Sequence, residues 1–521
     1  MLIDSLKNLN FFIAGAGLSG IAIAKLLKKN AVNVFITEAK SISDAIKLEL
    51  SEQKISFEEN GHNLINLIKN CHILIISPGI PLNTELVLTC KRNKIPVISE
   101  IEAASWFAKP KCNIIGITGT NGKSTTTHYL AQLLNKKYKA MPCGNIGISL
   151  AQTITEYPDI DTFVIELSSY QLESTYSVRP FCSIFLNIQN DHLLRYENIT
   201  EYLKAKWRLV ALTADNGIVI IDKNVLNLAL HIGLSLPRAQ IIVVEDKTNS
   251  NATLLPLKSN YDIFNFSKTL PIAFYKELRY LNLESVLLPT LYHSAYANYS
   301  ENGSISISYH SDNHKINWHI QNPCLPGKHN MLNIFVASIC ALHMNIPENI
   351  ILAQWEEKTS DYKHLPHRLE KISAGYNVYT DENNKNKNIL IINDSKATNV
   401  ESTLVAIASF QQPIRLLLGG EAKGDSYLPI SSFLGKNIIK IYPFGQAAST
   451  ISNELSQYKN YLAKESLNLI SAANLALNEA NNNEIILLSP ACSSFDEFKN
   501  FEHRGDIFRE WALLHLKDKI K

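Results

Sequence analysis

The sequence predicts an α/β protein of three domains, each built around a largely parallel sheet with helices on its faces. Three observations indicate this fold class. Short apolar stretches alternate with amphipathic helical stretches along most of the chain, which is typical of parallel sheets. The charged linker Lys109-Pro110-Lys111 and a later change to polar composition interrupt that alternation. A chain of 521 residues is also too long for a single hydrophobic core, since a domain takes about 150 residues.

Residues 1–110 form the first predicted domain. The apolar run at 11–24 has the length of a secretory leader, but Lys25, Lys28 and Lys29 follow it where a small-residue cleavage site belongs. We therefore interpret the run as strand, turn and helix, and we expect a soluble, cytoplasmic chain. The strand candidates of this domain are residues 10–14, 33–37, 73–77 and 96–99.

Residues 111–364 form the second predicted domain, and its middle part differs in character. Residues 247–321 are rich in Ser, Asn and Tyr and lack helical periodicity. Strict alternation at 304–309 and 315–320 predicts a hairpin turning at 311–313. We interpret this region as an antiparallel elaboration, and we read its His310, His314 and His319 as surface residues rather than metal ligands. The other predicted elements are strands at 113–118, 162–167, 183–188 and 217–221 and a helix at 330–344.

Residues 365–521 form the third predicted domain, again of alternating strands and helices. The polar stretch 381–388 is predicted to be a disordered hairpin tip. The strand candidates are residues 389–392, 414–418, 439–443 and 484–489.

Composition excludes several classes of protein. Lys+Arg 50 against Asp+Glu 48 gives a net charge of +2, so nucleic acid is not an expected partner. Apolar runs are too short to span a membrane, which takes about 20 residues. The 8 cysteines contain no C-x-x-C pair, which favours reduced thiols over a disulfide frame or a zinc site. We expect a monomer that acts on small molecules.

A phosphate-binding loop is the strongest motif. Residues 119–125 (Gly-Thr-Asn-Gly-Lys-Ser-Thr) follow a predicted strand and open a helical pattern. Backbone N–H groups of such a turn face phosphates, and the helix N-terminus adds partial positive charge. Lys123 would reach the outer phosphates, and Ser124 or Thr125 would approach Mg²⁺. The common P-loop has a glycine where this chain has Ile117, so this loop is a shorter subtype.

Two polar clusters end strands of the same block, at the edge where open α/β sheets bind ligands. Glu166 ends one strand, and Asn190-Asp191-His192 follows another. Carboxylate oxygens suit Mg²⁺, and an imidazole beside a carboxylate completes a second metal site. The alternative for Glu166 is that it only caps the next helix.

A second glycine-rich loop lies at the amino terminus. The residues Gly15, Gly17, Leu18, Ser19 and Gly20 follow a strand, and Glu38 lies further along. This is a dinucleotide-binding fingerprint in outline, and it predicts a Rossmann-like domain with room for a diphosphate. Because an ATP loop is present elsewhere, we expect a diphosphate other than NAD here.

The third block carries polar clusters after three of its strands, in 393–399, 418–423 and 489–496. Two lysines and several hydroxyls at one sheet edge favour an anion-binding cleft suited to a small dicarboxylate. Each cluster alone could instead be a helix cap, as Asp394 or Ser395 would allow.

These motifs together resemble the Mur ligase family. The resemblance rests on residues 119–125, Glu166-Leu167-Ser168-Ser169, Asn190-Asp191-His192, Gly327-Lys328-His329-Asn330 and His367-Arg368. Residues 393–399 and 489–496 resemble the branch of the family that adds D-glutamate to a UDP-N-acetylmuramoyl-L-alanine substrate. The resemblance covers nearly the whole chain except 247–321 and 381–388. It implies a Rossmann-like first domain, a central P-loop-type ATP-binding domain and a Rossmann-like third domain.

The resemblance also implies roles for residues. UDP-substrate contacts would come from Gly15, Gly17, Leu18, Ser19, Gly20, Glu38 and Asn145. ATP contacts would come from Gly119, Thr120, Asn121, Gly122, Lys123, Ser124, Thr125, Asn330, Arg368 and Asp394. Mg²⁺ would be held by Ser124, Glu166, His192 and a carbamylated Lys206. D-glutamate would be held by Lys396, Thr398, Lys423, Ser494 and Phe501, and the catalytic residues would be Lys123, His192, Lys206 and Lys396.

The chemistry expected from the resemblance is amide-bond formation through an acyl phosphate in peptidoglycan precursor synthesis. Three alternatives stay open at this point. The chain could be another ligase of the same fold, including one that adds glutamates to folate. It could be an NAD-binding sensor or a P-loop switch, although no Asn-Lys-x-Asp guanine signature is present. A pure binding protein would have no need for Glu166, His192 and Lys206 around one phosphate loop.

Overall fold

The computed structural model describes residues 5–189, 195–246, 292–299, 305–310, 315–321, 324, 328–356, 359–360, 365–372, 377–380 and 385–516. By their internal contacts the residues divide into two compact units. The first unit is Met1–Pro323 with Leu332–Ser360, and the second is Cys324–Met331 with Asp361–Lys521. No helix within the described ranges is long and apolar enough to cross a membrane.

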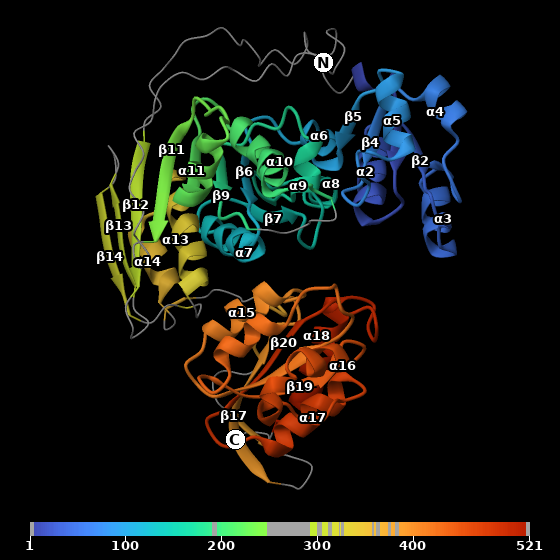
Figure 1. The fold of residues 1–521 in the computed structure, drawn as a ribbon. Coiled ribbons are helices and arrows are strands. Elements are labelled where there is room, and N and C mark those ends of the chain that lie inside the picture. The colour runs from blue at the N-terminus through green and yellow to red at the C-terminus, as the bar shows by residue number, and fades with distance from the viewer. Residues whose placement is uncertain are drawn as a thin grey trace. The chain divides into compact units, whose positions relative to one another are not determined.

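A parallel sheet of order β3-β2-β1-β4-β5 begins the first unit. Alternate residues of β1 enter different cores: Phe11 and Ile13 pack with α2, while Phe12 and Ala14 pack on the other face with α4 and α5. This two-sided burial explains the uninterrupted apolar sequence of β1. The elements, blue in Figure 1, are β1 (Asn10–Ala14), α2 (Leu18–Lys29), β2 (Asn33–Thr37), α3 (Asp44–Glu52), β3 (Ser56–Glu58), α4 (Leu64–Asn70), β4 (Ile73–Ile76), α5 (Glu85–Arg92), β5 (Val97–Ser99) and α6 (Glu100–Ser105).

A second sheet of the same unit has the order β14-β13-β12-β11-β10-β9-β6-β8-β7 in the part of the chain that is described. Strand β6 lies between β8 on one side and β9 on the other. The chain therefore reverses its direction of winding beside β6, which is where sheets of this type bind ligands. The elements are β6 (Asn113–Thr118), α7 (Lys123–Leu134), β7 (Ala140–Gly144), α8 (Leu150–Glu156), β8 (Thr162–Glu166), α9 (Ser169–Glu173), β9 (Cys182–Phe185), α10 (Ile199–Ala211), β10 (Ile218–Asp222), α11 (Lys223–His231) and β11 (Gln240–Asp246).

The predicted antiparallel elaboration forms the edge of this second sheet, at the yellow-green end in Figure 1. Strand β12 pairs in parallel with β11, and β13 and β14 then follow in antiparallel pairs. The predicted turn at 311–313 lies outside the described residues, as do His314 and residues 247–291. Trp355 on α14 donates its indole N–H to the hydroxyl of Ser338 on α13 at 2.9 Å. The elements are β12 (Tyr292–Tyr299), β13 (Ile305–His310), β14 (Lys315–Ile320), α13 (Lys328–His343) and α14 (Glu348–Trp355).

Helix α6 joins the two sheets of the first unit through two buried carboxylates. One oxygen of Glu100 accepts the N–H of Ala151, at the start of α8, at 2.9 Å. Glu102 accepts the N–H of Tyr176 at 2.8 Å and that of Ser177 at 2.9 Å. One continuous apolar core also spans both sheets. Buried carboxylates with backbone donors fix the chains that they join, so these two sheets form a single unit.

Glu100 predicts a specific pH dependence of stability. Burial raises the pKa of Glu100 from its ordinary 4.5 to about 7, and only the Ala151 N–H opposes this. The folded chain holds this proton to a higher pH than the unfolded chain does. The stability that protonated Glu100 contributes is therefore fully present below pH 4.5 and is lost as the pH rises through 7. We expect Glu100→Gln to reduce the fall in thermal midpoint between pH 5 and 8, by the equivalent of roughly 1–3 kcal/mol.

The exposed Glu156 on α8 offers a matched control for this measurement. Glu156→Gln should leave the wild-type slope of midpoint against pH unchanged. Equal slopes for wild type and Glu100→Gln would contradict the raised pKa of Glu100.

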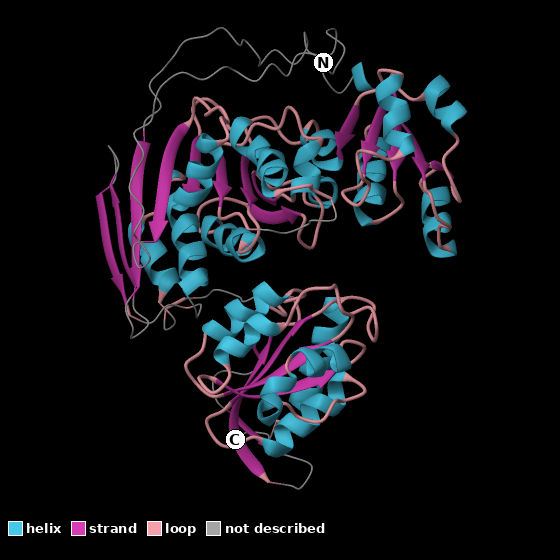
Figure 2. Ribbon diagram, viewed as in Figure 1, coloured by secondary structure: helices cyan, strands magenta, loops and turns pink. Residues whose placement is uncertain are grey.

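The second unit is built on a sheet of order β15-β17-β20-β18-β19, with β16 paired to β17. Leu416 and Leu418 of β18 enter one core and Leu417 enters another, so helices cover both faces, as Figure 2 shows. The elements are β15 (Glu370–Lys371), β16 (Asn377–Thr380), β17 (Asn386–Asn393), α15 (Val400–Ala408), β18 (Ile414–Gly419), η2 (Leu428–Phe433), β19 (Ile438–Phe444), α16 (Ala448–Glu454), η3 (Ser456–Tyr461), α17 (Leu469–Glu479), β20 (Ile485–Ala491) and α18 (Phe501–His515).

The predicted loop at 381–388 is wrong at its carboxyl end. Strand β17 already begins at Asn386, and Asn386 and Asn388 pair with β16 across an antiparallel ladder. Polar residues form strand here because backbone pairing with β16 supplies the hydrogen bonds, whatever the side chains. The rest of that prediction, residues 381–384, lies outside the described residues.

Candidate active site

The loop between β6 and α7 has the conformation that its glycines predict. Gly119 has φ +149° and Gly122 has φ +85°, values that side chains with a Cβ rarely adopt. A Cβ on Gly122 would also lie 2.3 Å from Oδ1 of Asn333 on α13. Gly122 is the residue before the first turn of α7, so the helix N-terminus opens directly from the loop.

Two lysines meet at this loop. Lys123 Nζ donates to the carbonyls of Gly119 at 2.9 Å and Thr120 at 2.7 Å. Lys206 on α10, only 1% exposed, also donates to the Gly119 carbonyl at 2.9 Å. Its Nζ lies 4.6 Å from the centre of the Tyr202 ring. Two cationic groups thus converge beside a helix N-terminus, which is an arrangement that attracts anions.

Glu166 lies beside the same loop. It pairs with Ile117 across the β6–β8 ladder and is 3% exposed. One carboxylate oxygen accepts from Nδ2 of Asn145 at 3.1 Å, and the Asn145 N–H donates to the Glu166 carbonyl at 2.9 Å. Helix α9 is capped by Ser168, so the alternative that Glu166 is a helix cap is wrong.

The residues expected to hold Mg²⁺ are placed in part. Ser124 is buried in the first turn of α7, and Glu166 and Lys206 flank the loop. His192, with Asn190 and Asp191, lies outside the described residues. Ser124 and Glu166 supply hard oxygen atoms at the end of adjacent elements, which fits Mg²⁺.

The amino-terminal glycine loop is open to solvent above α2. Gly15 has φ +100°, and a Cβ on it would lie 2.6 Å from Ser77 Oγ. A Cβ on Gly20 would lie 2.0 Å from the Gly15 carbonyl, whereas a Cβ on Gly17 would meet nothing within 4 Å. The side chain of Leu18 is 86% exposed. Glu38 accepts the Ala16 N–H at 2.8 Å. Ser19 lies in the first turn of α2.

A cleft of about 830 Å³ lies between the loop after β4 and helices α9 and α10. Gly79 and Asn83 line it on the side of the first sheet. On the other side Arg195 forms an ion pair with Glu173 and lies 4.3 Å from the centre of the Tyr170 ring. The cleft thus combines aromatic surface with both signs of charge, and it is large enough for a sugar-sized group.

In the second unit, Asp394 is a buried acid after β17. It accepts from Ser489 Oγ at 2.9 Å and from the Leu369 N–H at 3.2 Å. Burial raises the pKa of Asp394 to about 7, and Ser489, the Leu369 N–H and Arg368 oppose that rise. Helix α15 is capped by Asn399, so neither Asp394 nor Ser395 is its cap.

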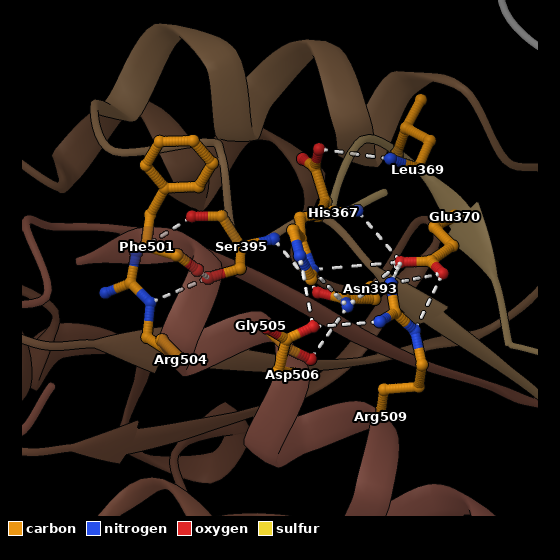
Figure 3. Close-up of polar contacts among 11 residues, drawn as sticks. His367, Leu369, Glu370, Asn393, Ser395, Phe501, Arg504, Gly505, Asp506 and Arg509 are labelled. Atoms are coloured by element: carbon orange, nitrogen blue, oxygen red, sulfur yellow. Dashed lines mark hydrogen bonds and ion pairs between the residues drawn. The ribbon is translucent and has the colours of Figure 1, made fainter. Parts of the chain in front are cut away.

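His367 lies between Asn393 and Asp506, as Figure 3 shows. Its Nδ1 lies 3.0 Å from Nδ2 of Asn393, and its Nε2 lies 3.5 Å from Asp506. Burial lowers the pKa of His367. A Cβ on Gly505 would lie 2.1 Å from His367 Nδ1. The ring therefore packs against a glycine of α18, which fixes the backbone that carries Arg368.

The residues expected to bind D-glutamate lie at one edge of the second unit. Strand β20 runs between β17 and β18, so the loops after these three parallel strands are neighbours. Lys396 Nζ lies 3.9 Å from the centre of the Phe501 ring. Thr398 is half-buried, Ser494 is buried and Lys423 is exposed. Asn330, expected at the nucleotide, is buried on α13.

Arg504 of α18 is a residue that the motifs did not single out. Its fully buried guanidinium donates to the Ser395 carbonyl at 2.9 Å, to the Ser493 carbonyl at 3.0 Å and to the Cys492 carbonyl at 3.2 Å. Burial lowers the pKa of Arg504 to about 10, so the group stays charged at neutral pH. It joins the loop that carries Lys396 to the loop that carries Ser494. An arginine in the middle of a helical pattern gave no signal for this role.

Comparisons with protein families and solved structures find relatives of this chain. Residues 12–86 match the family described as MurD N-terminal domain, and residues 117–269 match the Mur ligase middle domain. The fold is similar to that of a MurF ligase from Thermotoga maritima in complex with ADP, with a TM-score of 0.51, 13% identity and coverage of 92% of this chain and 95% of that chain. Fold and phosphate loop together define the class of the Mur ligases.

Two curated relatives narrow that class. A UDP-N-acetylmuramoylalanine--D-glutamate ligase of Elusimicrobium minutum is 32% identical over 513 residues, which is 96% of each chain. The ligase of the same name from Cytophaga hutchinsonii is 32% identical over 506 residues, 96% of this chain and 98% of the relative. The chain belongs to the UDP-N-acetylmuramoylalanine--D-glutamate ligase family.

Proposed function

We propose that this chain joins D-glutamate to UDP-N-acetylmuramoyl-L-alanine with ATP, in peptidoglycan precursor synthesis. The observation that carries the proposal is that the 119–125 loop, Glu166 and Lys206 converge at one sheet edge. The names of the full-length relatives support the choice of substrates.

The reaction has two steps because a carboxylate is a poor acyl donor. In the first, an oxygen of the L-alanyl carboxylate attacks the γ-phosphorus of ATP, the bond to ADP breaks, and an acyl phosphate forms. In the second, the D-glutamate amine attacks the acyl carbon and loses a proton, and inorganic phosphate leaves with one carboxylate oxygen. Both steps bring anions together, so positioning and neutralisation of charge dominate catalysis.

Residues at the phosphate loop fit that requirement. Lys123 would exchange its bonds to the Gly119 and Thr120 carbonyls for bonds to phosphate oxygens. Ser124 and Glu166 would hold Mg²⁺, which neutralises charge on the transferring phosphoryl group when it is bound. Lys206, buried beside the Gly119 carbonyl, would become an anion on carbamylation and would then help to hold Mg²⁺.

The first unit also has room for the long UDP-substrate. The open loop around Gly17 would take the diphosphate end, because nothing lies within 4 Å of a Cβ there. The 830 Å³ cleft beside Gly79 would take part of the sugar and peptide. Asn145, bonded to Glu166, would contact the substrate near the reacting carboxylate.

The second unit would bind D-glutamate and contribute to the nucleotide site. Lys396 and Lys423 would pair with carboxylates, Thr398 and Ser494 would donate hydroxyl hydrogen bonds, and Phe501 would pack beside them. Asp394 would accept from ribose hydroxyls, and Arg368 and Asn330 would contact the nucleotide. The positions of Asp394, Lys396, Thr398, Lys423 and Ser494 after parallel strands of one sheet support their assignments. The roles of Arg368 and Asn330 rest on the family resemblance.

The test is release of inorganic phosphate from UDP-N-acetylmuramoyl-L-alanine, ATP and D-glutamate, with each component omitted in turn. We expect phosphate only with all three present, and a new product whose mass exceeds that of the UDP-substrate by one glutamate residue. L-glutamate and other amino acids serve as comparison. Turnover with another amino acid, and none with D-glutamate, would contradict the proposed substrate.

A further inference from the structure

Asn187 connects the end of β9 to the phosphate loop through its side-chain amide. Its Oδ1 accepts the backbone N–H of Thr120 at 3.1 Å and that of Asn121 at 2.8 Å. Its Nδ2 donates to the Asn121 carbonyl at 3.0 Å. One side chain therefore makes the pair of bonds with Asn121 that a neighbouring strand would make.

These bonds give the first half of the loop a fixed partner. The Asn187 carbonyl also accepts the Thr120 N–H at 3.1 Å, and a Cβ on Gly119 would lie only 3.0 Å from the Leu186 Cβ. The Gln189 N–H donates to Thr120 Oγ1 at 3.0 Å. Residues 119–121 are thus bound along their length to residues 186–189.

The role of this contact follows from the short loop. In the common P-loop the backbone N–H groups of a longer turn face the phosphates. Here the Thr120 and Asn121 N–H groups are engaged by an oxygen of the protein itself. The groups left to bind a phosphate are the N-terminus of α7, which follows Gly122, and the side chain of Lys123.

We propose that Asn187 is a positioning residue for ATP, whose amide takes the place of the turn that the shortened loop lacks. By holding Thr120 and Asn121, it aims the α7 N-terminus and Lys123 at the β- and γ-phosphates. This inference rests on the proposed binding of ATP at residues 119–125. An amide suits the position better than a carboxylate, because it donates to Asn121 as well and adds no negative charge beside a triphosphate.

The experiment compares nucleotide binding with binding of the UDP-substrate in the full-length chain. Titration with ADP and Mg²⁺, without turnover, should give a dissociation constant at least 10-fold higher for Asn187→Ala than for wild type. The dissociation constant for UDP-N-acetylmuramoyl-L-alanine should stay within 2-fold, because its contacts lie at other loops. If Asn187 served folding alone, Asn187→Ala would lower the thermal midpoint and would change the dissociation constants for ADP and for the UDP-substrate by similar factors.

Two further variants test whether ADP binding depends on the amide of Asn187 itself. Asn187→Asp retains an oxygen for the Thr120 and Asn121 N–H groups, so it should fold even if Asn187→Ala does not, yet it should weaken ADP at least 10-fold by charge repulsion. Gln189→Ala is the control, because Gln189 is exposed and its Oε1 accepts from the Asn121 side chain, at 2.8 Å, rather than from the loop backbone. This variant should bind ADP as wild type does.

The outcomes separate this inference from the proposed function. If wild type binds ADP and makes product but Asn187→Asp and a folded Asn187→Ala bind ADP within 2-fold of it, the role of Asn187 is wrong and the ligase function stands. If wild type itself binds no ADP, both fail together.

Discussion

Replacing Lys123 by alanine is expected to abolish ADP formation. Lys123 is the cation closest in sequence to the α7 N-terminus, and its Nζ is already held over the loop by the Gly119 and Thr120 carbonyls. Without it, charge that develops on the transferring phosphoryl group loses its direct partner. We expect kcat to fall at least about 10³-fold, equivalent to about 4 kcal/mol of transition-state stabilisation.

The measurement is ADP release with both co-substrates present, alongside binding of the UDP-substrate to the same variant. Binding should stay within about 3-fold of wild type, since the open loop at Gly17 lies in the other sheet. Lys139→Ala is the matched control, because Lys139 is exposed beyond the far end of α7. Persisting turnover in Lys123→Ala would show that another residue neutralises the γ-phosphate.

The apolar strands of the parallel sheets were predictable from sequence. The expected strands at 10–14, 33–37 and 113–118 coincide with β1, β2 and β6. Both faces of such strands are buried, so their sequences are uninterrupted apolar runs with polar residues at the ends. The α/β fold class is confirmed on this basis.

Polar strands were not predictable in the same way. Strand β12 consists of Tyr, His, Ser, Ala and Asn residues, and only its ladders with β11 and β13 make it a strand. Strand β17 likewise begins with Asn386-Lys387-Asn388, which pair with β16. At sheet edges, backbone partners far along the chain override local preference.

The loops of the site were predictable, but the residues that hold them were not. Gly119 and Gly122 signal a turn through their own conformational freedom, and Lys123 follows them directly in sequence. Arg504 and Asn187 act on loops that lie far from them along the chain. Such residues leave no local pattern, because their partners are backbone carbonyls and N–H groups that every residue carries.

The second large effect is expected at Lys396. Its Nζ is held 3.9 Å from the centre of the Phe501 ring, and the hydroxyl of the preceding Ser395 donates to the Phe501 carbonyl at 2.8 Å. The ammonium is therefore oriented before a substrate arrives, at the edge where β17 and β20 end. We expect Lys396→Ala to raise KM for D-glutamate about 30-fold or more, because a charge-assisted bond to a carboxylate contributes about 2 kcal/mol.

The measurement compares KM for D-glutamate with KM for ATP in the same preparation. The KM for ATP should change less than about 3-fold, since the phosphate loop belongs to the other unit. Lys499→Ala serves as control, because Lys499 is an exposed lysine of the segment between β20 and α18. Equal increases in both KM values would mean that Lys396 binds the nucleotide, and the anion site after β17 would then belong to ATP rather than to D-glutamate.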